Sequence, residues 1–272
     1  MTATIGHLLR GRISPESFQH LRYRKWYLQF YLPRLTASNF IRRTPKVQGF
    51  PSSRPPELLV NQIRDVNVVA PTEMCRVMTR HGSDKGNGVH NYTTIYSVLF
   101  GDLRDRPLRI FELGLGTNNP ELASTMGATG YPGASLRGWR ELFPNALVYG
   151  ADIDRGILFE EDRIRTFYCD QLDDAAIRDL WSRPELQGGM DILIEDGLHT
   201  FEANLFFLER SLEQLRPGGI YVVEDIYYDT FELWSNQLGT VFAKRFPNHE
   251  FVLVSLPPDE EHTNLMIARR LR

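Results

Sequence analysis

The 272-residue sequence predicts an α/β protein with a doubly wound, seven-stranded, mostly parallel sheet. Short apolar stretches that read as buried strands alternate with segments of helical periodicity, the pattern of a parallel sheet covered by helices. The first five strands each end in an acidic residue and are expected at Leu108–Glu112, Leu147–Asp152, Arg165–Asp170, Asp191–Asp196 and Ile220–Asp225. The last two, Glu250–Ser255 and Leu265–Arg269, lie too close together for a crossover helix, so they predict a C-terminal antiparallel hairpin.

The N-terminal residues 1–56 are expected to form a short helical arm and a linker, ahead of one domain over residues 57–272. Residues 1–50 are basic and aromatic, with nine Lys and Arg against one acid, and an amphipathic helix is expected over Ser17–Leu35. Residues 44–56 are rich in Pro and Ser and predict the linker. The arm can pack on the more acidic remainder or on a second subunit, or contact acidic lipid or nucleic acid.

The helices are expected before and between the strands, at Thr72–Arg80, Thr93–Phe100, from near Ser135, and at Asp174–Ser182, Phe201–Leu215 and Phe231–Phe246. The Pro217–Gly218–Gly219 triplet predicts the end of the fifth helix. Between the first two helices lies a glycine-rich polar loop, Gly82–Gly86, bracketed by His81 and His90, which could close over a bound cofactor.

The composition excludes several classes of protein. A net charge of −3 carries no strong nucleic-acid signal, and two cysteines outside any CxxC pair, Cys75 and Cys169, predict neither a zinc ribbon nor a disulfide framework. The sequence has no apolar run of membrane-spanning length and no secretory h-region, so we expect a cytoplasmic protein.

The end of the first strand predicts a cofactor site. Glu112, Gly114 and Gly116 form a Glu-x-Gly-x-Gly turn, whose glycines allow a sharp turn and close approach of a ligand, and Thr117 follows them. The third glycine of the dinucleotide fingerprint is missing, and no helix is expected directly after the turn. Ligands of open α/β sheets bind outside the carboxyl ends of the strands, which is where this turn lies.

Further candidates for this site follow the next strands. Asp152 ends the second strand, where a carboxylate can accept both ribose hydroxyls of an adenosine. Asp170 and Gln171 follow the third, where a side chain can read the adenine amino edge. Ser135 is expected to cap the helix after the long loop, and its hydroxyl and the free N–H groups there could bind a carboxylate.

Three carboxylates predict a metal site on two neighbouring strands. Asp196 ends the fourth strand, and Glu224 and Asp225 end the fifth, so their repulsion requires a cation or protons. Oxygen ligands suit a hard ion such as Mg²⁺, which would bind two adjacent substrate hydroxyls. His199 follows Asp196 by three residues, on one face if a helix starts there, and could take the proton of a substrate hydroxyl. Tyr92 and the pair Tyr227–Tyr228 could stack on a sugar or an aromatic acceptor.

Together, these motifs resemble the metal-dependent class I S-adenosylmethionine sugar O-methyltransferases of the mycinamicin and rhamnosyl type. The resemblance covers about residues 72–230 and is carried by residues 82–96, Ile110–Thr117, Gly133–Trp139, Phe143–Asp154, Cys169–Gln171, Ile194–His199 and Gly218–Ile226. Where the mycinamicin enzymes have a large additional N-terminal domain, this chain has a short basic arm, so the acceptor stays open.

The resemblance implies a Rossmann-like methyltransferase fold, S-adenosylmethionine and Mg²⁺. It implies Asp196, Glu224 and Asp225 as metal ligands, His199 as the base with Asp196 beside it, and a cofactor set of Glu112, Gly114, Gly116, Thr117, Ser135, Asp152, Asp170 and Gln171. We therefore expect a cytoplasmic O-methyltransferase that modifies a rhamnose-like deoxysugar on a natural product, as in antibiotic biosynthesis, or on a glycolipid. A dimer or tetramer is expected, because the aromatic arm needs a surface to pack on.

Three alternatives remain open at this point. The acceptor can be a catechol or another small molecule, since Mg²⁺ binds its vicinal oxygens equally well. A nicotinamide oxidoreductase is disfavoured by the missing third glycine and by the terminal hairpin. A non-catalytic module that docks through the basic arm would show strongly salt-dependent binding and no turnover.

Overall fold

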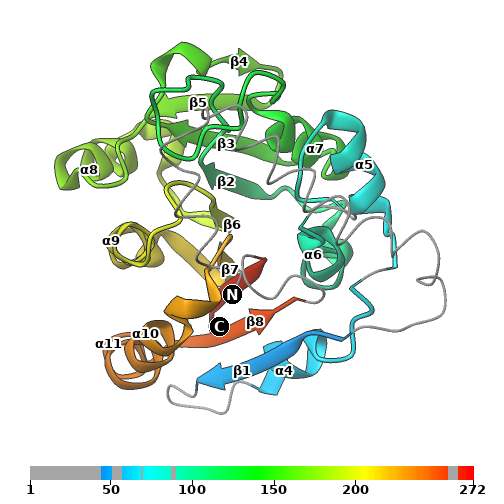
Figure 1. Ribbon diagram of the computed structural model, residues 1–272, viewed down its shortest axis with the longest axis vertical. Coiled ribbons are helices and arrows are strands. Elements are labelled where there is room, and N and C mark those ends of the chain that lie inside the picture. Colours follow the sequence, from blue (N-terminus) through cyan, green and yellow to red (C-terminus); the bar gives the residue numbers. More distant parts are fainter. Residues whose placement is uncertain (1–43, 51–56, 69, 87–89, 257–262) are drawn as a thin grey trace, which may run out of the picture. The chain divides into compact units, whose positions relative to one another are not determined.

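A nine-stranded sheet runs through the computed structural model, which describes residues 44–50, 57–68, 70–86, 90–256 and 263–272 (Figure 1). The strand order is β1-β8-β9-β7-β6-β2-β3-β5-β4. The strands are β1 Lys46–Phe50, β2 Arg109–Leu113, β3 Leu147–Asp152, β4 Glu160–Glu161, β5 Ile164–Tyr168, β6 Met190–Glu195, β7 Leu215–Val223, β8 His249–Ser255 and β9 Asn264–Arg270. The helix expected over Ser17–Leu35 lies outside the described residues.

The seven predicted strands are confirmed, in the expected arrangement. β5, β3, β2, β6 and β7 pair in parallel, and the β8–β9 hairpin joins β7 through an antiparallel pairing with β9. Because the five central strands run the same way, their acid-bearing carboxyl ends meet at one edge of the sheet. A short β4 extends one side of the sheet and β1 the other.

The expected linker over residues 44–56 contains β1, so that part of the prediction was wrong. β1 pairs antiparallel with β8, with Lys46 opposite Ser255 and Phe50 opposite Phe251. Phe50 is buried in the core, and the strand covers an edge of β8 that would otherwise expose unpaired backbone groups. The neighbouring Pro and Ser residues hid this short strand in the sequence. The division of the chain at residue 56 stays a prediction.

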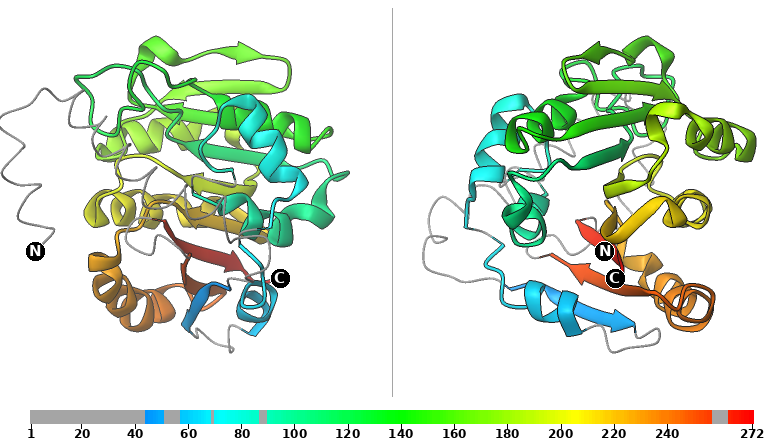
Figure 2. Two further views of the ribbon diagram at one scale, coloured as in Figure 1. Left: turned by 45° about the vertical axis from the view of Figure 1, so that its right-hand side comes forward. Right: turned by 180° about the vertical axis from the view of Figure 1, so that it is seen from behind.

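Helices cover both faces of the sheet, as Figure 1 and Figure 2 show. The α-helices are α4 Glu57–Ile63, α5 Glu73–His81, α6 Tyr92–Phe100, α7 Ala134–Leu142, α8 Asp174–Ser182, α9 Phe201–Ser211, α10 Phe231–Asn236 and α11 Ala243–Arg245. The π-helix η7, Gln237–Phe242, joins the last two. The 3₁₀ turns are η2 Gly101–Leu103, η3 Arg155–Ile157, η4 Pro184–Leu186, η5 Leu212–Gln214 and η6 Tyr228–Thr230.

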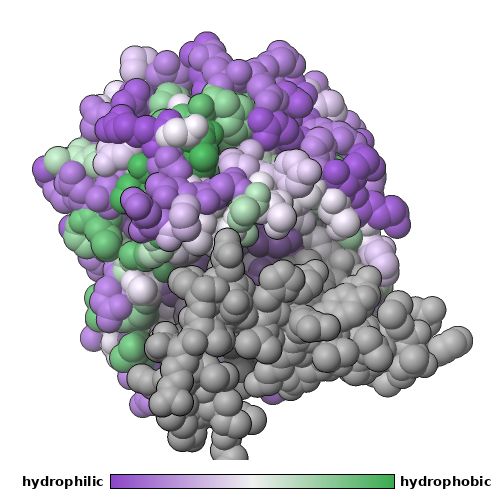
Figure 3. Space-filling view, turned by 45° about the horizontal axis from the view of Figure 1, so that its top comes forward, coloured by the Kyte–Doolittle hydropathy of each residue, from purple (hydrophilic) through white to green (hydrophobic). Residues whose placement is uncertain are grey.

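Alternation along the strands separates two hydrophobic cores. In β2, Ile110 packs with α4, α5, α6 and α7 on one face, whereas its neighbour Phe111 packs with α8, α9 and α10 on the other. Successive side chains of a strand point to opposite faces, so each central strand contributes to both cores. Figure 3 shows that hydrophilic residues predominate on the face drawn there, with smaller groups of hydrophobic residues between them.

The expected helix Phe201–Leu215 ends earlier than predicted. α9 stops at Ser211, a 3₁₀ turn follows, and β7 already begins at Leu215. The Pro217–Gly218–Gly219 triplet therefore lies inside β7 and not at a helix end. The pairing register of β7 against β6 shifts between Met190 and Ile192, and such irregularities accommodate Pro and Gly in a strand.

Candidate functional site

A cavity of about 400 Å³ lies at the carboxyl ends of the central strands. Its walls come from the ends of β2, β3, β5, β6 and β7, from the loop after α5 and from the long loop before α7. Large apolar side chains of the cavity wall stay partly exposed: Met126, Tyr131, Ile153 and Leu172. The volume is in the range of small-molecule and cofactor sites.

The glycine turn after β2 brings two strand ends into backbone contact. Gly114 has a φ of +87°, and a Cβ atom there would lie 1.9 Å from the carbonyl oxygen of Asp196. Gly116 has a φ of +77°, and its Cβ would lie 2.3 Å from Cε of Met126. The left-handed φ favours glycine at both positions, and at Gly114 the contact with backbone also leaves no room for a side chain. The turn therefore places the predicted cofactor residues beside Asp196 of the predicted metal site.

Glu112 lies buried beneath the turn and is fully engaged by its neighbours. Ser135 Oγ donates to its Oε1, and Trp139 Nε1 donates to its Oε2 at 2.6 Å. Gly133 occupies the N-cap position of α7, and its lack of a side chain leaves no side-chain cap, so the prediction that Ser135 caps this helix was wrong. Ser135 lies in the first turn and orients Glu112 instead.

Asp152 is held facing the cavity by two backbone groups. Its Oδ2 accepts the N–H of Leu115 at 2.7 Å and its Oδ1 accepts the N–H of Asp154 at 2.8 Å. Burial raises the pKa of Asp152 above its ordinary value. Thr117 also lines the cavity, and its hydroxyl donates to Asp154 at 2.5 Å. The two loops after β2 and β3 are thus tied together under the cavity.

Gln171 supports the chain after β6, because both ends of its amide are bonded within the protein. Its Nε2 donates to Glu195 Oε1, and its Oε1 accepts the N–H of Leu198, both at 2.9 Å. Asp170 also lines the cavity, and its Oδ1 accepts the N–H of Leu172 at 2.9 Å. Of the two residues predicted to read the adenine edge, Asp170 is therefore the better placed.

Asp196, His199 and Asp225 come together at the ends of β6 and β7. Each offers one ligand atom, and these atoms all lie within 4.8 Å of one another. His199 precedes α9 in a loop, with a φ of 61°, so the expected helical i, i+3 relation to Asp196 was wrong. Asp225 has a φ of 53°. Non-glycine residues in this conformation are strained, and such strain gathers at functional sites.

Glu224 lies outside this group of three. Its Oε2 accepts from Lys85 Nζ at 2.6 Å and its Oε1 accepts from the Tyr96 hydroxyl. Its side chain is 1% exposed. The three predicted metal ligands are therefore neighbours, but Glu224 is not part of the close group that Asp196 and Asp225 form with His199.

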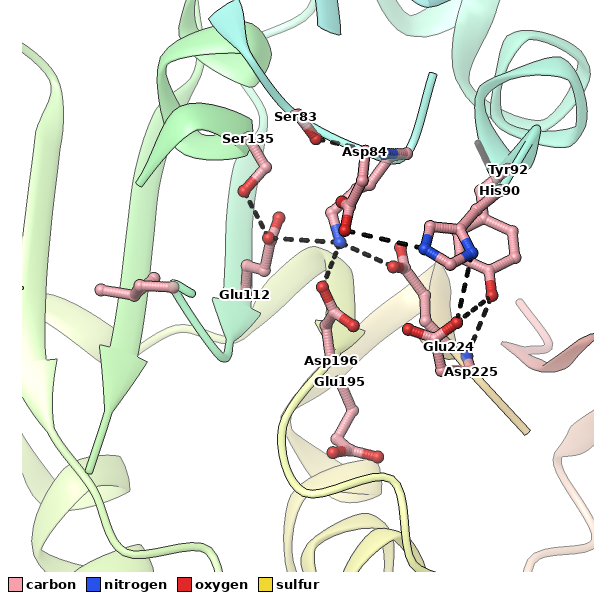
Figure 4. Close-up of polar contacts among 12 residues, drawn as sticks. Ser83, Asp84, His90, Tyr92, Glu112, Ser135, Glu195, Asp196, Glu224 and Asp225 are labelled. Atoms are coloured by element: carbon pink, nitrogen blue, oxygen red, sulfur yellow. Dashed lines mark hydrogen bonds and ion pairs between the residues drawn. The ribbon is translucent and has the colours of Figure 1, made fainter. Parts of the chain in front are cut away.

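Lys85 is a residue of this site that we did not predict. Figure 4 shows three carboxylates that lie close to its ammonium group, those of Glu112, Asp196 and Glu224. Its Nζ lies 2.5 Å from Asp196 Oδ2, 2.6 Å from Glu224 Oε2 and 3.5 Å from Glu112 Oε1. Burial alone would lower the pKa of Lys85, but the surrounding carboxylates outweigh it and raise this pKa well above its ordinary value. Lys85 is thus a buried cation. A lysine in a glycine-rich loop, beside a cleft with excess acid, was the available signal.

A second pair of side chains faces Asp225: His90 from the loop before α6, and Tyr92 from the first turn of this helix. The Tyr92 hydroxyl donates to Asp225 Oδ1 at 2.6 Å, and the ring of His90 stacks on that of Tyr92 with 5.2 Å between centroids. Tyr92 is fully buried, so its expected stacking on a sugar was wrong. Burial alone would lower the pKa of His90, but the carboxylates of Asp225 and Asp84 outweigh it and raise this pKa to about 10.

The site's donor set fits a hard cation. Asp196 and Asp225 supply carboxylate oxygens, the ligands that Mg²⁺ prefers. In the described part of the chain, Nδ1 of His199 is buried without a hydrogen-bond partner. An orphaned buried nitrogen beside two carboxylates indicates that this group completes its contacts with something the protein binds.

Comparisons with known proteins show which proteins the chain is similar to. No protein-family model matches the chain. The 8-demethyl-8-alpha-L-rhamnosyl tetracenomycin-C 2'-O-methyltransferase of Streptomyces olivaceus is 38% identical over 156 residues, which is 56% of this chain and 38% of that protein. The mycinamicin VI 2''-O-methyltransferase of Micromonospora griseorubida is 33% identical over 156 residues, 57% of this chain and 36% of that protein. The chain spans less than half the length of these curated relatives.

Solved structures show the same fold. The MycE methyltransferase from the mycinamycin biosynthetic pathway, solved in complex with Mg and SAH, superposes with a TM-score of 0.55 at 24% identity, over 79% of this chain and 61% of that one. The described helices include none long and apolar enough to cross a membrane. Over the matched part of its length the chain is similar to O-methyltransferases that act on rhamnosyl tetracenomycin and on mycinamicin, and its fold is that of the class I methyltransferases.

Proposed function

We propose that this protein transfers a methyl group from S-adenosylmethionine to a hydroxyl of a rhamnose-like deoxysugar on a glycosylated natural product. One observation carries the proposal: the cavity joins the glycine turn and Asp152 to Asp196, His199 and Asp225 at one edge of the sheet. By their names, one relative is a 2'-O-methyltransferase of rhamnosyl tetracenomycin-C and the other a 2''-O-methyltransferase of mycinamicin VI. The sugar is therefore the acceptor class that the similarity favours.

The methyl donor would occupy the side of the cavity formed by β2, β3 and β5. Asp152 would accept the ribose hydroxyls, since its two backbone hydrogen bonds hold the carboxylate toward the cavity. Asp170 would face the adenine. The first turn of α7 would offer its free N–H groups to the carboxylate of the methionine part. Glu112, Ser135 and Thr117 would hold these loops in position. The donor supplies an electrophilic methyl group on a sulfonium.

The acceptor would bind on the side of β6 and β7. Asp196 and Asp225 would hold a divalent ion, and when bound this ion supplies Lewis-acid polarisation of oxygen. Glu224 would complete the predicted set of three carboxylates, although it also serves Lys85. His199 would accept the proton of the sugar hydroxyl at Nε2, which lies 3.9 Å from Asp225 Oδ2. The Asp225 carboxylate would stabilise the resulting imidazolium. Alignment of acceptor and donor would supply much of the rate.

Titration calorimetry with S-adenosylhomocysteine tests the donor half of the proposal. The protein should bind this product in the micromolar range, as is typical of enzyme ligands. A protein that binds none of it has no methyl donor site, and the proposal fails at its first step.

A labelled-donor assay tests the acceptor. We expect methyl transfer from radiolabelled S-adenosylmethionine to rhamnosyl glycosides and little transfer to catechols of similar size. The reverse preference would keep the donor and the ion but replace the sugar with an aromatic diol. If the protein binds NADH and does not bind S-adenosylhomocysteine, the nicotinamide oxidoreductase alternative is favoured instead.

A further inference from the structure

Lys85 places one ammonium group at the ends of three adjacent strands. Glu112 belongs to β2, Asp196 follows β6 and Glu224 follows β7, and all three lie within 3.5 Å of its Nζ. The Lys85 side chain is 2% exposed. Among the ion pairs of the described residues, no other Lys or Arg reaches these three carboxylates. One buried cation therefore serves the whole group.

Contacts with both neighbouring helices hold the loop that carries Lys85 in position. Gly82 ends α5 in a left-handed conformation, with its N–H bonded back to the helix. The carbonyl oxygen of Lys85 accepts both the N–H and the hydroxyl of Thr93, each at 3.1 Å. A Cβ at Gly86 would lie 2.5 Å from Thr79 Oγ1, so the backbone is pressed against α5. Both flanking helices thus fix the lysine, and the described part of the loop is not a free lid.

Without a bound ion, the repulsion among the three carboxylates has to be offset by this ammonium group or by protons. Glu112 and Glu224 are each 1% exposed, so water cannot solvate them. Buried like charges at the ends of neighbouring strands repel one another and weaken the fold unless they are paired. The Ser135, Trp139 and Tyr96 donors satisfy individual oxygen atoms but leave the net charge unchanged.

We propose that Lys85 is a tethered counter-cation, which neutralises the acid cluster in the ion-free protein and yields part of that role to the divalent ion. The inference rests on the proposed function for the ion itself. Lys85 acts through the carboxylates and is a positioning residue. Because it holds two of the predicted ligands, Asp196 and Glu224, an incoming ion must share them with the ammonium or displace it. Lys85 therefore keeps the empty site folded and limits the affinity for the ion.

Thermal unfolding of Lys85→Met tests the first half. In EDTA we expect the variant to unfold about 10 °C below the wild type, since removing one partner of a buried ion pair costs several kcal/mol. Added MnCl₂ should restore most of this loss, whereas the wild type should gain much less. Lys244→Met, an exposed lysine of α11, is the matched control and should behave as wild type in both buffers.

Titration calorimetry with Mn²⁺ tests the second half. Removing a positive charge beside the ligands should raise the affinity at least tenfold. Lys85→Met that unfolds with the wild type in EDTA, or binds Mn²⁺ more weakly than the wild type, overturns the inference.

A charge-balanced variant covers the case in which Lys85→Met does not fold. Lys85→Met/Glu224→Gln removes one negative charge together with the positive one, and keeps an amide oxygen for Tyr96. We expect it to be more stable in EDTA than the single variant. If no charge change restores folding, the lysine is only a packing element and the inference is wrong. If the wild type binds no Mn²⁺, the proposed function loses its divalent ion. The proposed competition between this ion and Lys85 for the carboxylates then fails as well. If the wild type binds Mn²⁺ but Lys85→Met changes neither stability nor affinity, the inference about Lys85 is wrong and the ion of the proposed function is unaffected.

Discussion

Single residues around Asp225 set the chemistry that this site can perform. His199 and His90 approach its carboxylate from two loops, at 3.9 Å and 3.5 Å, and the Tyr92 hydroxyl bonds to it. His199 and Asp225 both adopt left-handed backbone conformations, which cost roughly 1 kcal/mol or more each. In these conformations the two side chains lie close to each other and to Asp196. A change at His199 should therefore affect turnover more than stability.

His199→Ala should lower kcat roughly 100-fold or more, because a general base contributes this much to proton removal. Binding of S-adenosylhomocysteine should stay within a factor of three. His81→Ala is the matched control, since His81 ends α5 and pairs with Glu141 on the surface. Full turnover in His199→Ala would show that another residue acts as the base, and His90 would be the next residue to test.

Asp152→Asn should weaken binding of S-adenosylhomocysteine roughly 10- to 100-fold, because an amide cannot accept two ribose hydroxyls as a carboxylate can. Its effect on kcat at saturating donor should be small. Asp162→Asn removes an acid whose side chain is 87% exposed, and it should leave the affinity unchanged. Calorimetry on the three proteins decides the matter, and equal affinities would exclude Asp152 from the donor site.

At the scale of elements, the site depends on how the end of β2 meets the end of β6. Gly114 lies against the backbone of Asp196, so the glycine turn and the acid cluster are positioned by one contact. A side chain there would push apart the donor side and the acceptor side of the cavity. This contact also explains why the signature after β2 contains glycine although no helix follows it directly.

Gly114→Ala should destabilise the fold by roughly 2–4 kcal/mol, through the left-handed φ and the clash with Asp196. It should also weaken donor binding. Gly101→Ala is the control, because Gly101 has a φ of −55° and open space around its Cβ position. Urea unfolding should show little change or a small gain for the control. A neutral Gly114→Ala would mean that the two strand ends can separate freely.

The strand β8 carries a buried histidine that predicts an acid-sensitive fold. His249 lies between the rings of Phe246 and Phe251, and burial lowers its pKa to about 4. The unfolded chain takes up this proton near pH 6.5, before the folded one does. Stability from this group is therefore complete above pH 6.5 and is lost as the pH falls toward 4, by about 3 kcal/mol in total.

His249→Phe should flatten this limb of the pH profile, whatever its effect at neutral pH. The measurement is the free energy of unfolding by urea at pH 7, 5.5 and 4.5 in both proteins. A variant that loses as much stability as the wild type between pH 7 and pH 4.5 would show that other groups cause the acid sensitivity.

At the scale of the whole molecule, one cavity is divided between two sets of strands. Glu112 and Asp152 lie at the ends of β2 and β3, and Asp170 follows β5. Asp196 and Asp225 follow β6 and β7. Donor binding and ion binding should thus separate experimentally. Removal of divalent ions with EDTA should lower methyl transfer roughly 100-fold or more, while S-adenosylhomocysteine affinity stays within a factor of three. Equal loss of both would mean that the ion also organises the donor side.

Local patterns determined much of the architecture in advance. Apolar runs ending in acids located the five parallel strands, and the short spacing before the last strand determined the hairpin, because a crossover helix needs more residues. The same pattern placed Glu112, Asp152, Asp196 and Asp225 at one sheet edge. This succeeded because the carboxyl ends of neighbouring parallel strands must meet, whatever the details of packing.

Only the tertiary structure decided which partners these residues have. Lys85 is 111 residues from Asp196 and 139 from Glu224, and β1 pairs with a strand near the other end of the chain. Gln171 likewise bonds to Glu195 of β6 and to the N–H of Leu198 in the chain after it. No periodicity connects such residues, since their contacts depend on where the loops pass once both cores have formed. The sequence by itself determined the layers and the sheet edge at which the cavity lies. The folded chain decided how the charge at that edge is balanced.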